Sequence, residues 1–568
     1  MKFLRGFSLL ALLLPGCSCL AAAEQAREEQ EPLAAARKAY SEKKWEETAA
    51  IANGPATQPA ELDYLEGMAL MHLQRWEAAR EAFSAGQKKA PKDSRFLAER
   101  AGAEYRLEDF AAAKKDLRGV LQLEPKDEYA LEFLGTIYLL EGNLEATLKY
   151  WNRIGKPRLA DVTSSPKPAL KEKLLLGALT FHAPQVLTAD SWLATQARLA
   201  NLGVFPQQRL ELVPAGDADY SAILHLGESG GWGGPGSGAL VSLLGGVPYE
   251  TVYPAWFNAG GRAINFRSLL RWDAQKRRAF AEVTSPVERR AVRLVSFFID
   301  ARNENWNLSR TFSSSSAPVT DLNLRKIEAG AELRFISNGN WSWSAGAAVM
   351  GRTFSNLAPG LPPGAAPFFT SGTSMEGWVK AEAKLVRVSE RRFTVDGSAE
   401  SRFGRGWKSG LGRYGSLGGA LEAKWLPHAR GGDDAVHFLV RGANLFGLVT
   451  LDQLFELGLD RDSTLWMRGH GATIDGKKGR APLGRRYVLF NSEYDKTLYD
   501  AGLFRLEAGP FVDMGKITDP SGAFGDPRWL VDAGMQVKLR LLRNVSVVLS
   551  YGRDLRNGQG AFFGMTEH

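Results

Sequence analysis

The C-terminal part of the chain, from about residue 235 onward, alternates between apolar and polar positions. Residues 327–335, 379–385 and 531–541 show this pattern most clearly, for example as Val379, Ala381 and Ala383 interleaved with Lys380 and Glu382. A period of two predicts β-strands that are apolar on one face only. Soluble sandwiches and membrane barrels both contain such strands, so the alternation by itself leaves both folds open.

The number of strands separates the two folds. Residues 235–568 provide roughly 330 positions, and at about 20 residues for a strand and its turn they yield about 16 strands. A closed antiparallel barrel leaves no exposed sheet edge, and we therefore predict a transmembrane barrel over 235–568. Aromatic residues at 249–256 and 341–343 would then lie at the membrane interface.

A different periodicity, of 34 residues, is found in residues 24–158. Trp76, Phe110 and Leu144 recur at this interval and are each expected to begin the second helix of a pair. The positions expected to pack the pairs are Gly67, Ala79, Phe83, Pro91, Ala101, Ala113, Leu117, Pro125, Gly135 and Trp151. The pattern resembles tetratricopeptide repeats, with a degenerate first unit around Trp45, and predicts a solenoid with a concave groove. The groove could dock a partner, or the array could be a spacer.

Between the two regions we expect a linker over 159–172, which contains Pro166 and Pro168, and then a small α+β domain over 173–230. Asp190 is a plausible helix N-cap. Two strands are predicted at 209–213 and 220–226.

The first 23 residues are expected to be a secretory signal, because a basic start precedes a short apolar stretch and small residues. Cleavage after Ala23 and lipidation of Cys17 are alternative outcomes. The chain's two cysteines, Cys17 and Cys19, both lie here, so no disulfide is expected after cleavage. The net charge of +8 is spread along the chain without an aromatic-basic pattern, and we expect no nucleic-acid partner.

Two short sequences near the C-terminus contain the most specific signal. Met467-Arg468-Gly469-His470 falls in a long predicted loop, and Phe511-Val512-Asp513-Met514-Gly515 lies on an alternating strand. On that strand Asp513 faces away from the apolar side, and Glu493 on the preceding strand has the same orientation.

These residues resemble the outer-membrane assembly and translocation superfamily, which includes the Bam and Tam barrel subunits, two-partner secretion transporters and bacterial surface antigens. The resemblance implies that the Arg-Gly loop folds back into the lumen, where Arg468, followed by Gly469, contacts Asp513 of the strand that also carries Phe511 and Gly515. Glu493 would be a second partner of Arg468. Within the 173–230 domain, residues 198–205 resemble the end of the helical part of a POTRA domain, a periplasmic module of this superfamily whose sheet edge can accept an incoming strand.

No catalytic constellation is recognisable, and we expect neither an enzyme nor a metal or cofactor. The glycines at 231, 233 and 236 fit a dinucleotide pattern without its strand-turn-helix context.

The resemblance therefore implies an outer-membrane barrel that inserts or translocates client polypeptides, while periplasmic repeats dock a partner protein. The alternative is a scaffolding barrel that tethers a periplasmic complex without translocation. A passive pore is a third reading, which an inward-folded loop would disfavour.

Overall fold

The computed structural model describes residues 31–55, 57–216, 219–229, 246–288, 291–308, 321–357, 365–407, 411–429, 434–501, 504–541 and 545–567. The possible lipidation site Cys17 and the glycines at 231–236 lie outside these residues. The chain divides into two units, one of residues 1–140 with 149–154 and one of residues 141–148 with 155–568.

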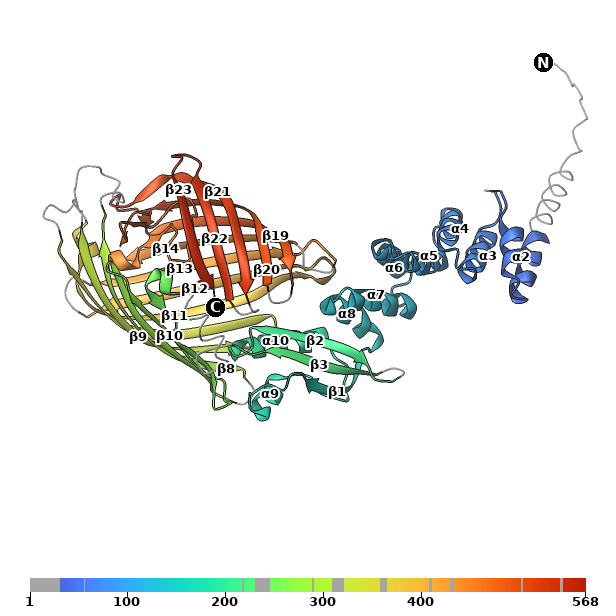
Figure 1. The fold of residues 1–568 in the computed structure, drawn as a ribbon, viewed down its shortest axis with the longest axis horizontal. Coiled ribbons are helices and arrows are strands. Elements are labelled where there is room, and N and C mark those ends of the chain that lie inside the picture. Colours follow the sequence, from blue (N-terminus) through green and yellow to red (C-terminus); the bar gives the residue numbers. More distant parts are fainter. Residues whose placement is uncertain are drawn as a thin grey trace, which may run out of the picture. The chain divides into compact units, whose positions relative to one another are not determined.

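Helices in antiparallel succession make up the first unit (Figure 1). After a helical segment at 31–41, they are α2 Trp45–Ala52, α3 Ala60–His72, α4 Trp76–Lys89, α5 Ser94–Arg106, α6 Phe110–Leu123 and α7 Glu128–Leu140. Helix α8 Leu144–Trp151, whose first five residues belong to the second unit, and the short η1 Asn152–Ile154 follow. Helices α4, α6 and α8 begin at the predicted positions.

Small residues let the paired helices approach closely. A Cβ on Gly67 would overlap the ring of Phe83, and a Cβ on Gly135 would overlap Trp151. Ala79 and Ala113 are fully buried at the same kind of contact. Pro91 and Pro125 lie just beyond the ends of α4 and α6, where a proline cannot continue the helix. Gly67 and Gly135, two repeats apart, thus each lie against a large side chain.

One carboxyl group in this unit, that of Glu104, is buried with only a distant cation, since its Oε1 lies 3.9 Å from Arg100 Nε. Arg100 donates to Asp116 through Nη2 over 2.8 Å, which satisfies that pair. Glu104, beside them, has an Oε2 without a hydrogen-bond partner. Burial, with the nearby Asp116 charge, raises the pKa of Glu104 to about 7. The folded repeats therefore favour the protonated form of this side chain.

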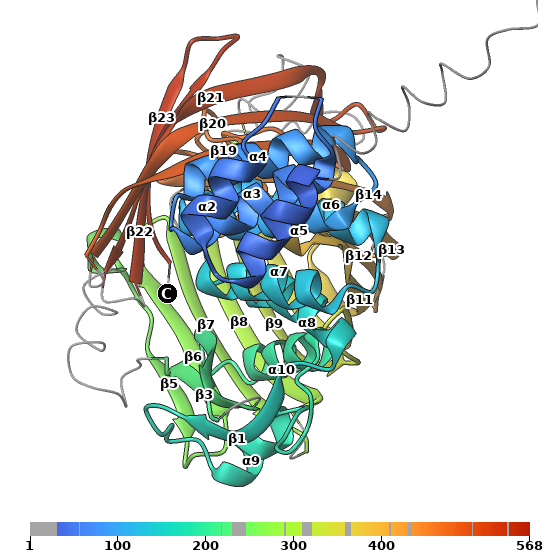
Figure 2. The ribbon, with the colours of Figure 1, turned by 90° about the vertical axis from the view of Figure 1, so that its right-hand side faces the viewer.

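The second unit begins with a small α+β module. It consists of β1 Arg158–Ser164, α9 Glu172–Ala178, α10 Ala189–Asn201, β2 Gln207–Pro214 and β3 Asp219–Gly227. The strand order is β1-β3-β2, with β1 parallel and β2 antiparallel to β3 (Figure 1). Figure 2 shows β1 and β3 of this sheet with the helices α9 and α10 of the module.

Two sequence predictions are wrong here. The expected linker over 159–172 is a strand up to Ser164, because Leu159 is buried and the segment pairs with β3. The N-cap of α10 is Thr188, not Asp190. Thr188 and Ser191 form a capping box in which each side chain accepts from the other residue's backbone N–H.

Three hydrogen bonds tie the module to turns at one end of the barrel. Asn265 donates to the Leu202 carbonyl over 2.7 Å, and Asn201 donates to the Ala291 carbonyl over 3.2 Å. The Lys171 N–H donates to the Gly261 carbonyl over 2.8 Å. We call this the module end of the barrel and the opposite rim the far end.

Antiparallel strands form the rest of the unit, and their hydrogen-bonded order is a closed circuit. They are β4 Thr251–Val252, β5 Ala255–Ala259, β6 Ile264–Trp272, β7 Lys276–Pro286, β8 Arg293–Trp306, β9 Leu322–Ile336, β10 Trp341–Ser355, β11 Gly372–Val388, β12 Phe393–Gly406, β13 Arg413–Trp425, β14 Asp434–Gly447, β19 Arg486–Asp500, β20 Phe504–Thr518, β21 Gly525–Leu541, β22 Val545–Asp554 and β23 Gly560–Glu567. The prediction of about 16 strands covers residues 235–568. Residues 235–245 lie outside the described part, and the number therefore stays a prediction.

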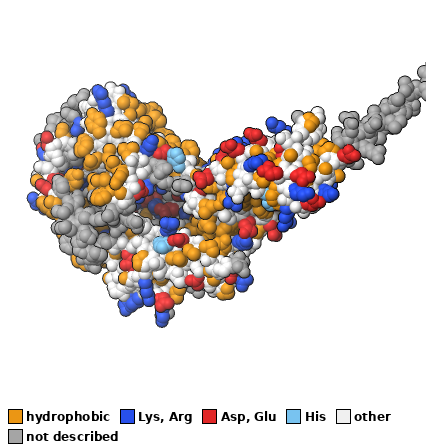
Figure 3. Space-filling model, turned by 45° about the vertical axis from the view of Figure 1, so that its right-hand side comes forward, with side chains coloured by type: hydrophobic (Ala, Val, Ile, Leu, Met, Phe, Trp, Pro, Cys, Tyr) orange, Lys and Arg blue, Asp and Glu red, His pale blue; other side chains and the backbone are white. Residues whose placement is uncertain are grey.

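The two faces of the wall differ as the alternation predicts. On β20, Val512 and Met514 are exposed on the outside, whereas Asp513 between them is completely buried. Hydrophobic side chains gather over the outer wall (Figure 3). No helix in the described ranges is long and apolar enough to cross a membrane.

Glu104 predicts how the stability of the repeats depends on pH. Because its folded pKa lies above the ordinary value of 4.5, the folded state holds the proton more tightly, and stability falls as pH rises from about 4.5 to about 7. Glu104→Gln should remove this loss, which is on the order of 1–3 kcal/mol. The pH dependence of repeat stability is measured by hydrogen exchange of α5 and α6 in the full chain at pH 5.5 and 8, corrected for intrinsic exchange rates. Glu77→Gln, at an exposed position of α4, is the control and should keep the pH dependence of the unmodified chain.

Candidate functional site: the loop tip inside the barrel

The segment between β14 and β19 enters the barrel from the far end. It contains η5 Leu451–Gln453 and two short ladders, β15 Phe455–Glu456 with β18 Leu483–Gly484 and β16 Thr473–Ile474 with β17 Lys477–Lys478. Met467 of this loop is fully buried against Leu457, Leu489 and Ile517, so an apolar cluster fixes the loop on the inner wall.

Arg468 at the loop tip is bound through most of its donors. Its Nε and Nη2 donate to the two carboxylate oxygens of Asp513 over 2.9 and 2.6 Å. Its Nη1 donates to Glu493 over 2.6 Å and to Gln536 over 2.9 Å. The guanidinium carbon lies 3.7 Å from the ring centroid of Phe511. This is a bidentate, aromatic-backed ion pair, shielded from solvent because the Arg468 side chain is only 3% exposed.

The strand register explains why the wall needs this cation. Asp513 on β20 is directly opposite Asp532 on β21, and Asp532 is directly opposite Asp554 on β22. All three carboxylates are buried. Like charges directly opposite one another destabilise a sheet. We call these three residues the aspartate row.

The loop tip lies across the aspartate row residue by residue. Arg468 pairs with Asp513, and the Gly469 N–H donates to Asp532 over 2.6 Å. His470 lies next to the carboxylates of Asp532 and Asp554. A Cβ on Gly469 would come within 2.6 Å of the Asp554 backbone nitrogen, so only glycine permits this approach. Gly515 faces Met467 and Leu457, where a Cβ would lie 3.0 and 3.1 Å from their nearest atoms.

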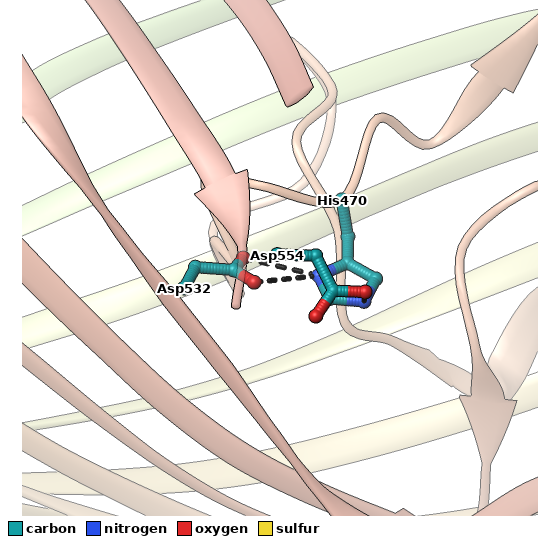
Figure 4. Close-up of side chains that lie close together, drawn as sticks. All are labelled: His470, Asp532 and Asp554. Atoms are coloured by element: carbon teal, nitrogen blue, oxygen red, sulfur yellow. Dashed lines mark hydrogen bonds and ion pairs between the residues drawn. The ribbon is translucent and has the colours of Figure 1, made fainter. Parts of the chain in front are cut away.

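His470 lies between two carboxylates and faces each with a different ring nitrogen (Figure 4). Nδ1 lies 2.9 Å from Asp532 Oδ1, and Nε2 lies 3.5 Å from Asp554 Oδ2. These three side chains have donor atoms near enough to one another for a metal ion. A metal would use one ring nitrogen with both carboxylates on the same side, whereas here each carboxylate faces its own nitrogen. The arrangement fits a hydrogen-bonded imidazole better than a three-ligand site.

A second group of loop residues binds the opposite part of the wall. Asp462 accepts from Arg271 on β6 over 2.6 Å and from Arg278 on β7 over 2.7 Å. Its side chain is 2% exposed. Lys478 is likewise buried, 3.8 Å from Glu304 on β8. The loop therefore joins the N-terminal strands to the C-terminal strands through the lumen.

Arg461 reaches the seam where the circuit closes. Strands β23 and β4 are neighbours there. Arg461 donates through Nη2 to the Gly564 carbonyl on β23 over 3.0 Å. Its guanidinium carbon lies 3.1 Å from the ring centroid of Tyr249, just before β4. One loop side chain thus contacts both sides of the seam.

The structure brings together four residues singled out from sequence, namely Arg468, Gly469, Glu493 and Asp513, with Phe511 beneath the arginine. The sequence analysis did not single out Asp532 and Asp554, although Asp532 falls at a lumen-facing position of the strand predicted over 531–541. It also missed Arg461 and Asp462, because their partners depend on where the loop lies in the lumen.

Arg468→Ala should lower the thermal stability of the barrel. The change leaves Asp513 buried without its cation, at a cost on the order of 3–5 kcal/mol. Arg468→Lys should retain only part of the lost stability, since an ammonium group cannot make the bidentate contact with Asp513. The temperature at which the barrel loses its compact migration on a denaturing gel measures the effect. Arg528→Ala is the control, because that side chain is 60% exposed. Equal midpoints for the two alanine variants would contradict the expectation.

No family model matches the chain, and no curated protein matches it in sequence. Among solved structures, it is similar to BamA from Haemophilus ducreyi lacking POTRA domains 1–3, with 13% identity over 72% of this chain and 84% of that one, at a TM-score of 0.42. It is also similar to CdiB from Acinetobacter baumannii, with 13% identity over 80% of this chain and 82% of that one, at a TM-score of 0.42. MamA matches 24% of this chain and 81% of its own, at 13% identity and a TM-score of 0.22. At these identities and TM-scores the matches are resemblances only and carry no evidence of a shared activity.

Proposed function

We propose that this chain is an outer-membrane barrel protein that inserts or translocates client polypeptides, and that its helical repeats dock a partner in the periplasm. The observation that carries the proposal is the loop, whose tip is bound to the aspartate row while its other contacts reach the first strands and the seam. A barrel with an apolar outer wall suits a bilayer, and a lumen occupied by a loop suits a gated path better than an open pore.

The loop contacts suggest which part would move. The tip is held by Arg468, Gly469 and His470 on three adjacent strands. At the seam, Arg461 makes one hydrogen bond to a backbone carbonyl and a ring contact. The seam contact has fewer bonds, so it would release first while the tip stays anchored. Opening at β23 and β4 would expose unpaired backbone groups that a client strand could use.

The α+β module offers a second place for an extended segment. Strand β1 is partly covered, since the Leu159 N–H donates to the Gln185 carbonyl and the Leu187 N–H to the Pro157 carbonyl. Strand β2 is at the other edge of the sheet, and its only ladder among the described residues is with β3. An unpaired edge can pair with an incoming strand, and β2 is therefore the edge we assign to clients.

Depletion of the protein in its native host tests the proposed function directly. Quantifying the outer-membrane and secreted proteomes should reveal lost proteins. Loss of many barrel proteins would indicate general assembly, and loss of one or a few would indicate a dedicated transporter. Unchanged proteomes would overturn the polypeptide-handling proposal and favour a scaffold that tethers a periplasmic complex.

The edge assignment has its own test. A photo-reactive amino acid at Arg209, which is exposed on β2, should crosslink to client polypeptides in living cells. The matched control is Lys173, which is exposed on α9 of the same module, away from the sheet edge. Crosslinks of equal yield from both positions would show proximity without strand pairing and would refute the assignment to β2.

A further inference from the structure

A row of side chains crosses four adjacent strands on the outside of the barrel, near the far end. The register places Trp272 on β6 opposite Arg277 on β7, Arg277 opposite Asn303 on β8, and Asn303 opposite Arg325 on β9. Trp272, Arg277 and Arg325 are exposed. Because neighbouring strands are about 4.8 Å apart, the two arginine backbones are separated by roughly 10 Å, and both guanidinium groups can reach one ligand between them.

These two arginines differ from those inside the barrel. Within the described residues, neither Arg277 nor Arg325 has a carboxylate within ion-pair distance, whereas Arg271 and Arg278 on the same wall both pair with Asp462. Residues 309–320, in the connection between β8 and β9, contain no acidic residue. Asn303, between the two arginines, is uncharged, and its side-chain oxygen accepts a hydrogen bond from Asn323 over 2.6 Å. The row presents two uncompensated positive charges to the outside.

Directly below this row, toward the middle of the wall, lies an apolar groove. The next outward positions are Leu270, Ala279, Ala301 and Ile327, again in direct register across the four strands. The two alanines form a low floor between the larger Leu270 and Ile327. The groove has a volume of about 380 Å³ and is bordered by Trp272, Arg277 and Arg325. Its shape suits a hydrocarbon chain that runs along the wall.

We propose that this groove is a binding site for an anionic phosphorylated membrane lipid, with an acyl chain over Ala279 and Ala301 and the phosphate between Arg277 and Arg325. Guanidinium groups match phosphate oxygens in geometry and charge. Trp272 lies where an aromatic ring contacts the interface between head group and chain. The site is near the far end of the barrel, and therefore in the leaflet away from the α+β module; this inference rests on the proposed place of the barrel in a membrane.

The chain offers a matched control at the same rim. Arg405 on β12 and Arg413 on β13 are exposed and directly opposite one another. Below them, however, Phe403 and Phe446 occupy the outer wall on either side of Gly415, with ring centroids 6.0 Å apart. This second pair has the same charge as Arg277 and Arg325 without an alanine floor. It separates general attraction to anionic lipid from binding in a groove.

Native mass spectrometry of the full chain, given equal amounts of phosphatidic acid and phosphatidylcholine with identical acyl chains, tests the proposal. The unmodified protein should retain phosphatidic acid preferentially. The R277Q/R325Q variant should reduce that preference roughly twenty-five-fold, since each of the two basic residues near a lipid head group contributes roughly a factor of five. Ala279→Phe, which keeps both arginines and fills the groove, should also reduce it. R405Q/R413Q should leave it unchanged.

Each other outcome has a definite meaning. Equal losses in the two double variants would show nonspecific charge attraction and overturn the site, as would an unmodified protein without preference. Retention unaffected by Ala279→Phe would exclude the groove as the place of the acyl chain. Insertion into lipid nanodiscs, checked in parallel, separates the two proposals. A barrel that enters bilayers without lipid preference contradicts only the lipid site, whereas one that never enters them contradicts the membrane assignment itself.

Discussion

Three buried carboxylates placed side by side on adjacent strands are the constraint on which much of this barrel depends. Asp513, Asp532 and Asp554 face the lumen in direct register, so β20, β21 and β22 cannot pair in this way unless positive charge and N–H donors arrive from elsewhere. The loop tip supplies both, with Arg468, the Gly469 N–H and His470. Leaving such a carboxylate uncompensated would cost several kcal/mol. The inserted loop is therefore part of what stabilises the wall, and not a segment that merely fills the space.

Two parts of the loop carry charges opposite in sign to the stretches of wall that they contact. Near β6 and β7 the loop provides Asp460 and Asp462 to Lys276, Arg271 and Arg278. Near β19 to β22 it provides Arg468 and His470 to the carboxylates. A loop turned around in the lumen would place like charges together. Charge complementarity thus selects one orientation, and that orientation also brings Arg461 to the seam.

The parts of this arrangement that follow from local pattern were predictable from sequence. Period-two alternation was enough to turn Asp513 and Glu493 inward, and the 34-residue repeat located α4, α6 and α8. Pairing across strands was not predictable, because alternation sets the face of a residue but not its neighbour. That is why the aspartate row was missed although Asp532 had been placed on a strand. Strand β1 was missed for a similar reason, since its partner β3 follows it by some 60 residues, with two helices and β2 between them.

The arginines of β7 show how one strand can serve two environments. Arg278 points into the lumen, where water is scarce and a cation requires a carboxylate, and it has both Asp300 and Asp462. Arg277, one residue earlier, points outward and has neither. In the proposed bilayer, an unpaired guanidinium in the apolar band would be costly, whereas at the rim it would reach the lipid head groups. Because Arg278 is paired within the chain and Arg277 is not, the outward arginine is the one left to interact with the surroundings. The same alternation that builds the wall therefore separates residues that hold the barrel together from residues available to recognise a ligand.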